Sequence, residues 1–87
     1  MGKYNRILIE VLSGQKDNNI NFNDLCNLLE KLGGDCRIRG DHLIFSFKNL
    51  PDNINIQPKG NKAKAYQIKQ IRQFLTYNKI GLGDEDV

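Results

Sequence analysis

The hydrophobic pattern of this chain changes its period at Gly33-Gly34, and this change limits it to folds that combine helices with a sheet. Before the glycine pair, apolar residues recur at helical spacing; after it, they alternate with polar ones. The alternation runs through residues 36–39 and 42–48, with Gly40-Asp41 between them. Two alternating runs joined by two residues, the first a glycine, predict a β-hairpin with a type II′ turn.

Helical periodicity predicts three helices. The first has an apolar stripe and ends at Gly14, and the second begins at Asn21, whose position three residues before Asp24 is typical of a helix cap. The third follows a loop at residues 60–62 and ends at Gly81. The three stripes are Tyr4, Ile7, Leu8, Val11 and Leu12; Phe22, Leu25, Cys26, Leu28, Leu29 and Leu32; and Ile68, Ile71, Phe74 and Leu75.

A third short strand is predicted around Ile54 and Ile56, closed by Pro58, so the element order is α-α-β-β-β-α. We therefore expect an α+β domain in which helices pack on one face of a three-stranded antiparallel sheet. With 87 residues, the chain has room for one small core. We assign residues 1–83 to this domain and expect the acidic residues 84–87 to be a disordered tail.

The hairpin predicts which side chains face the solvent. Leu43, Phe45 and Phe47 must face the helices, and Cys36 and Ile38 are expected in the core with them. Arg37, Arg39 and His42 then lie on the open face. A two-residue turn would place Arg39 directly opposite His42, with their Cβ atoms roughly 5 Å apart.

Positive charge is concentrated in the second half of the chain. The net charge is +3, but residues 53–83 contain six Lys or Arg and no acid. A block of one sign indicates a polyanion partner, although a solvated helix face explains it equally well. The apolar runs at 7–9 and 43–45 are too short to span a bilayer, and the N-terminus lacks a signal-peptide core. We therefore expect a cytoplasmic protein with no membrane partner.

Few catalytic schemes fit these residues. The chain has one histidine, two isolated cysteines and scattered acids, so we expect no metal site and no cofactor, and no phosphate-binding loop motif is present. A single histidine among cations suits RNA cleavage through the substrate's own 2′-hydroxyl. The histidine transfers protons, cations stabilise the charged phosphorane, and DNA is inert because it lacks that hydroxyl.

Four segments together resemble the HicA family. They are residues 20–29 (INFNDLCNLL), 37–45 (beginning RIRGDH), 54–58 (INIQP) and 61–68 (NKAKAYQI), which follow one another in the family's order. The resemblance covers about residues 20–80, and the helix within residues 1–14 is similar to the extension of a longer subgroup. Two positions depart from the family pattern: Asp41 stands where Ser is usual, and Ala65 stands where Pro is common.

The resemblance implies a fold like that of double-stranded-RNA-binding domains. It also implies a type II toxin that acts as a metal-independent endoribonuclease on mRNA, with a HicB-type antitoxin as its protein partner. His42 matches the family's catalytic histidine. Arg39, Gly40, Lys62 and Lys64 match family positions and are expected to bind RNA, while Tyr66 and Gln67, which also match, are either structural or substrate-positioning. We add Arg37 and Lys69 to the expected RNA-binding residues, Arg37 for the scissile phosphate and Lys69 for the backbone.

Two other functions stay open on the sequence. Asp41 could orient His42 or repel phosphate, and in the second case the same face would bind structured RNA without cutting it. The basic surface could also bind an acidic protein.

Overall fold

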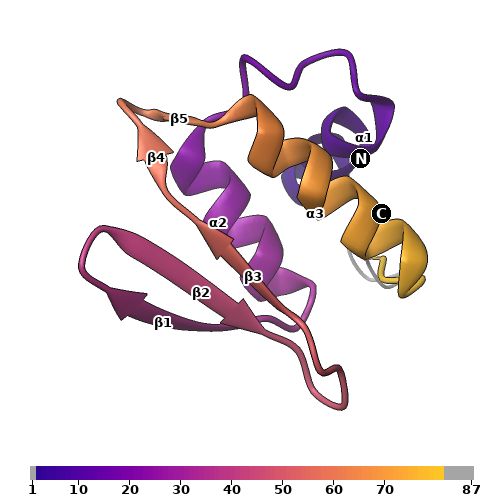
Figure 1. Ribbon diagram of the computed structural model, residues 1–87. Helices are drawn as coiled ribbons and strands as arrows, with labels where there is room; N and C mark the ends of the chain where they lie inside the picture. Colours follow the sequence, from indigo (N-terminus) through magenta and orange to yellow (C-terminus); the bar gives the residue numbers. More distant parts are fainter. Residues whose placement is uncertain (1, 82–87) are drawn as a thin grey trace.

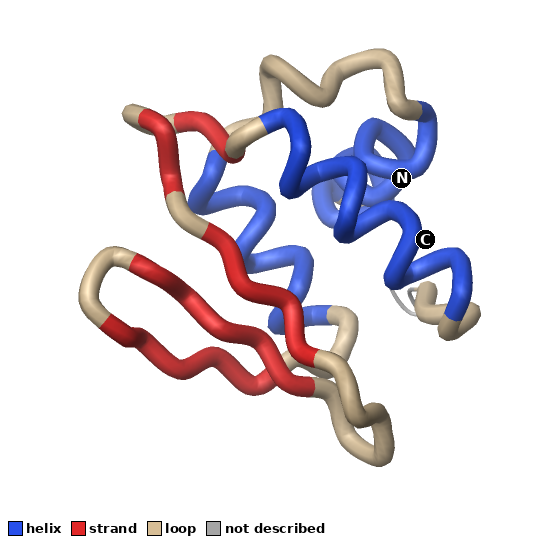
Figure 2. The backbone as a smooth tube through the Cα atoms, viewed as in Figure 1, coloured by secondary structure: helices blue, strands red, loops and turns tan. Residues whose placement is uncertain are grey.

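The computed structural model describes residues 2–81, and these form a two-layer α+β fold (Figure 1). The sheet of three strands lies on one side and the helices lie on the other, as the colouring in Figure 2 shows. No helix among the described residues is both long enough and apolar enough to cross a bilayer. The predicted tail, residues 84–87, lies outside the described residues. The elements are α1 (Lys3–Ser13), α2 (Phe22–Lys31), β1 (Asp35–Arg39), β2 (His42–Ser46), β3 (Asn53–Ile56), β4 (Pro58–Lys59), β5 (Lys62–Ala63) and α3 (Ala65–Tyr77).

The first hairpin of the main sheet has the predicted register. Its strands are antiparallel in the order β1-β2-β3, and Arg39 pairs with His42 at the closed end of the hairpin. Gly40 has a φ of 61°, whereas Asp41 has no positive φ. A positive φ at the first turn residue alone is what a type II′ turn requires. The hairpin prediction is therefore confirmed, and so is the element order around it.

A second small sheet was not predicted. Strands β4 and β5 form a two-residue hairpin at Gly60-Asn61, where the sequence suggested only a loop. The Ala63 N–H donates to the Ile20 carbonyl and the Phe22 N–H donates to the Asn61 carbonyl, both at 2.9 Å. These bonds tie the small hairpin to the start of α2. Strands of two residues carry no readable period, so the pattern could not reveal them.

The predicted helices form, but the third ends four residues earlier than Gly81. Lys79 takes a φ of 56°, and the Ile80 N–H donates back to the Leu75 carbonyl at 2.9 Å. This pair of features is a Schellman motif with lysine in the position that glycine usually occupies. The second helix starts as predicted, because the Asn21 side chain accepts a hydrogen bond from the Asp24 N–H.

The core lies between the helices and the inner face of the sheet, but two residues expected there are outside it. Ile38 is 74% exposed and Leu12 is 43% exposed. Ile38 has the inward parity, but β1 is an edge strand, and the turn end of the β1–β2 hairpin extends beyond the helices (Figure 1). Cys36 and Leu43 are only half-buried. The largest fully buried side chains are Phe45, Ile20, Leu25, Leu28, Leu29, Ile56, Ile68, Ile71, Leu75 and Val11.

One arginine joins the first and last helices. The Arg72 Nη1 donates to the Val11 carbonyl at 3.0 Å, and the guanidinium donates to both carboxylate oxygens of Asp17 at 3.0 and 3.2 Å. The loop between α1 and α2 is thereby attached to α3. We call Arg72, Asp17 and Val11 the arginine clamp.

Candidate functional site: the open face beside His42

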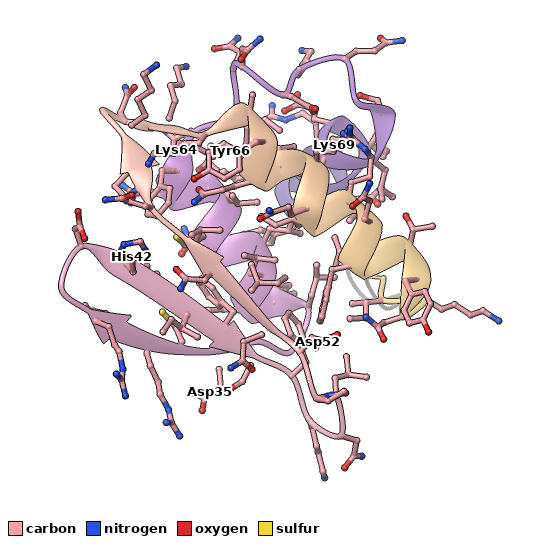
Figure 3. All side chains as sticks on the ribbon, viewed as in Figure 1. Asp35, His42, Asp52, Lys64, Tyr66 and Lys69 are labelled. Carbon is pink, nitrogen blue, oxygen red and sulfur yellow. The ribbon has the colours of Figure 1, made fainter. Side chains whose placement is uncertain are left out.

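His42 begins β2 on the open face of the sheet, and its ring is held from one side. His42 is labelled in Figure 3, and its ring Nδ1 lies 3.0 Å from the Asn55 Oδ1 on β3. Ile44 pairs with Asn55, so His42 is the diagonal neighbour of Asn55 on the same face. An amide oxygen can only accept a hydrogen bond, so this contact assigns the proton of the neutral ring to Nδ1. The free lone pair is then on Nε2.

The Nε2 side of the ring faces Asp41 at a longer distance. One carboxylate oxygen lies 3.6 Å from Nε2, too far for a hydrogen bond but close enough for an ion pair once the ring is protonated. The other carboxylate oxygen accepts a hydrogen bond from the Gln57 side chain. Asp41 thus leaves the lone pair of the neutral ring available and can stabilise the imidazolium that follows proton uptake.

Gln57 connects this pair to the basic hairpin. Its Oε1 accepts from the Lys64 Nζ at 2.8 Å, and its backbone N–H donates to the Gln67 Oε1 at 3.1 Å. Gln67 is only 4% exposed, so this bond anchors the segment between β3 and β4 to the first turn of α3. One continuous set of polar contacts therefore runs from Asn55 through His42, Asp41 and Gln57 to Lys64.

Two hollows flank this set of contacts. The arginine hollow has a volume of about 320 Å³ and lies on the open face of the sheet. The lysine hollow is larger, about 920 Å³, and lies at β4, β5 and the start of α3. The arginine hollow is lined by Arg37, Arg39, Ile44, Ser46 and Asn53, and the lysine hollow by Asn18, Lys59, Lys62, Ala63, Lys64, Ala65 and Tyr66.

The structure brings most of the sequence-predicted site residues together, with two qualifications. Lys69 lines neither hollow and lies further along α3, away from His42 (Figure 3). Gly40 serves the turn conformation: a Cβ built there would meet no atom within 4 Å, so no close backbone approach requires glycine. Arg37, Arg39, Lys62 and Lys64 line the two hollows on either side of His42.

Sequence reasoning missed Asn55 and Gln57. The alternation of Ile54 and Ile56 already implied that Asn55 faces outward with His42. The missing information was the pairing of β2 with β3, because the chain between them has no fixed turn geometry that sets a register. Gln57 follows the last paired residue of β3 and could not have been assigned a partner without that register.

The described residues contain no group of three His, Cys, Asp or Glu side chains placed to hold a metal ion. Both cysteines are free thiols. Burial raises the pKa of Cys26 from 9.0 to about 11, with Cys36 and Glu30 adding to the shift. These thiols lie on the helix side of the sheet, and neither lines a hollow beside His42.

Comparison of the chain with protein-family models, with curated proteins and with solved structures finds no match. The function is therefore inferred from the chemistry of the open face.

Proposed function

We propose that this protein is a metal-independent endoribonuclease that cleaves RNA through the 2′-hydroxyl, with His42 at its centre. The observation that carries the proposal is the contact between the His42 Nδ1 and the Asn55 Oδ1, at 3.0 Å. It leaves Nε2 as a free base on an open face flanked by cations. A base of this kind, near cations that can bind a phosphate, is what this reaction needs.

The reaction balances with these groups. Nε2 takes the proton of the 2′-hydroxyl, and the 2′-oxygen attacks the adjacent phosphorus. The bond from phosphorus to the 5′-oxygen breaks, and that oxygen takes a proton from water at the exposed site. The products are a 2′,3′-cyclic phosphate and a 5′-hydroxyl. Asp41 stabilises the imidazolium, and Arg37 and Arg39 hold the charged phosphoryl group.

The biological setting proposed from the sequence resemblance is that of a HicA-like toxin acting on mRNA in the cytoplasm. The order α-α-β-β-β-α is compatible with a domain like those that bind double-stranded RNA. A HicB-type antitoxin would inhibit the protein by covering the open face, and an acidic surface on that partner would complement Arg37 and Arg39. Co-expression with such a partner is expected to relieve toxicity and to protect His42 from chemical modification.

The test is cleavage of a labelled single-stranded RNA in EDTA, with a DNA oligonucleotide of the same sequence as a control. Wild type is expected to cut RNA only and to leave 2′,3′-cyclic phosphate ends. His42→Ala is expected to lose about 10²–10⁴-fold in rate, the usual contribution of a general base. Both proteins must show the same unfolding midpoint, so that the loss is chemical.

Full cleavage by folded His42→Ala would refute the proposal. So would a reaction that EDTA abolishes or products that lack the cyclic phosphate.

A second function, RNA binding without cleavage, is favoured by one observation. The Asp41 carboxylate stands 3.6 Å from the Nε2 and would repel a phosphate there. In that case wild type would bind RNA in a salt-sensitive manner and release no product. Asp41→Ser would then gain cleavage, whereas under the first proposal it is expected to change the rate less than His42→Ala does.

A further inference from the structure

The lysine hollow has a feature that phosphate binding alone does not require. Tyr66, on the first turn of α3, forms part of its lining and is 58% exposed. The lining beside it includes Ala63 and Ala65, whose side chains are single methyl groups. The volume of about 920 Å³ falls in the range of small-molecule sites, about 300–1,000 Å³.

The lysines around the ring are held without being neutralised. The Lys62 Nζ donates to the Asn19 Oδ1 at 2.7 Å, and the Lys64 Nζ donates to the Gln57 Oε1 at 2.8 Å. Both acceptors are uncharged amides. Among residues 2–81, no carboxylate pairs with these lysines or with Lys59. The hollow therefore keeps a positive charge in a defined place.

The frame of the hollow is also anchored. The backbone bonds between β5 and the start of α2 hold one side, and the buried Gln67 holds the start of α3 to Gln57. A site whose lining is fixed before the ligand arrives loses less entropy on binding. The same Gln57 side chain donates to Asp41, so hydrogen bonds connect the hollow to Asp41, whose other carboxylate oxygen lies 3.6 Å from the His42 Nε2.

An exposed aromatic ring among uncompensated cations is the arrangement that binds single-stranded nucleic acid, because bases stack on the ring while cations contact the backbone. A duplex would not use the ring, since its bases are stacked on each other and it is recognised through phosphates and 2′-hydroxyls. We infer that the lysine hollow binds one unpaired nucleotide of an RNA strand. Its base stacks on Tyr66, and its phosphates lie against Lys59, Lys62 and Lys64.

This inference rests on the proposed function in one respect, that RNA is the ligand. It adds that the strand is unpaired beside the cleavage site. Because Lys64 is connected to His42 through Gln57 and Asp41, we place the stacked nucleotide on the β4–β5 side of the scissile phosphate.

The test uses a short fluorescent oligonucleotide whose nucleotides all carry 2′-O-methyl groups, so that it cannot be cut. Tyr66→Ala is expected to weaken binding by on the order of ten-fold, the usual effect of losing one stacked base, and Tyr66→Phe is expected to bind as wild type does. Tyr77→Ala is the matched control, because Tyr77 is 86% exposed at the other end of the same helix and lines neither hollow.

Abasic substitutions identify the contact. Removing the stacked base from the oligonucleotide is expected to weaken binding to wild type and to have no further effect on Tyr66→Ala. NMR titration of wild type with the intact oligonucleotide is expected to shift the Tyr66 ring signals upfield, which requires no variant to fold.

The inference is overturned if Tyr66→Ala binds as tightly as wild type, or if the Tyr66 signals do not move. It is also overturned if a duplex of the same length binds more tightly than the single strand. Its failure is distinct from that of the proposed function. If RNA is cut but Tyr66 has no role in binding, the inference alone fails. If Tyr66 stacks the base but His42→Ala cuts as wild type does, the catalytic proposal alone fails.

Discussion

Arg72 and the three lysines of the lysine hollow are all positively charged and come from the same acid-free stretch of sequence. Their surroundings differ, because within the described part of the chain Arg72 is paired with a carboxylate and the lysines are not. Arg72 in the arginine clamp is 22% exposed and donates to a carboxylate and a backbone carbonyl. Lys59, Lys62 and Lys64 line a hollow, and Lys62 and Lys64 donate to uncharged amide oxygens. No carboxylate among residues 2–81 pairs with any of the three. The first arrangement uses charge to hold helices together, and the second keeps charge available for a ligand.

The largest effect on stability is expected at the clamp. Arg72→Met removes the guanidinium and leaves the Asp17 carboxylate, itself 20% exposed, without its partner. We expect a loss of about 3 kcal/mol in the free energy of unfolding, since a charged hydrogen-bonding group stays largely buried and unpaired. Urea unfolding measures it. Arg72→Lys is the control: it keeps the charge but not the two-pronged geometry and is expected to recover only part of the loss.

A clamp that were merely a surface ion pair would behave differently. Its removal would cost under about 1 kcal/mol and would depend strongly on salt. That result would remove the distinction between the two groups of cations.

The lysine hollow is expected to show the reverse behaviour. Changing Lys59, Lys62 and Lys64 together to Gln should leave the unfolding midpoint nearly unchanged and weaken RNA binding. The slope of log affinity against log salt should fall by about 2, since each phosphate contact to a single strand contributes about 0.7. Lys31, Lys48 and Lys79, exposed lysines outside the hollow, provide a matched triple variant with the same change in charge.

An equal loss in both triple variants would mean that only net charge matters. The lysines of the hollow would then bind RNA no better than other exposed lysines, and only the structural role of the arginine clamp would remain.

These contrasts mark the limit of what the sequence could predict. Periodicity and turn chemistry sufficed for the helices and for the pairing of Arg39 with His42, because both are local rules. These rules could not show that Arg72 has a structural role that the lysines lack, because the partners of Arg72 are Asp17 and Val11, more than fifty residues away in the chain. For the same reason they missed Asn55. Ile38 was misplaced because parity gives the face of a strand but not whether a helix covers that part of it.

A smaller effect is expected at Asn55, whose Oδ1 contacts the His42 ring. Asn55→Ala should lower kcat about ten-fold with KM unchanged, because the ring loses the acceptor that holds the Nδ1 proton. Asn55→Asp keeps an acceptor oxygen there and should restore most of the rate.

The protein has a single histidine, so its ring nitrogen NMR signals report the tautomer without overlap. The wild-type signals are expected to show Nδ1–H, and the Asn55→Ala signals a shift toward Nε2–H. An unchanged tautomer in Asn55→Ala would contradict this role.

The smallest effect compares the buried interior with the edge of the sheet. Cys26 is 8% exposed in α2, and its pKa is raised to about 11 by burial, whereas Cys36 is half-buried on the edge strand. Only the thiolate reacts with iodoacetamide, so Cys36 should be modified first at pH 8. Because a raised pKa means that the thiol ionises only at higher pH, the rate of Cys26 alkylation should keep rising until the pH passes about 11. Mass spectrometry of timed samples measures both rates, and Cys36→Ser isolates that of Cys26. Equal rates at pH 8 would mean that α2 separates from the sheet as readily as the edge strand frays, and the helix layer would not be the rigid support that both hollows need.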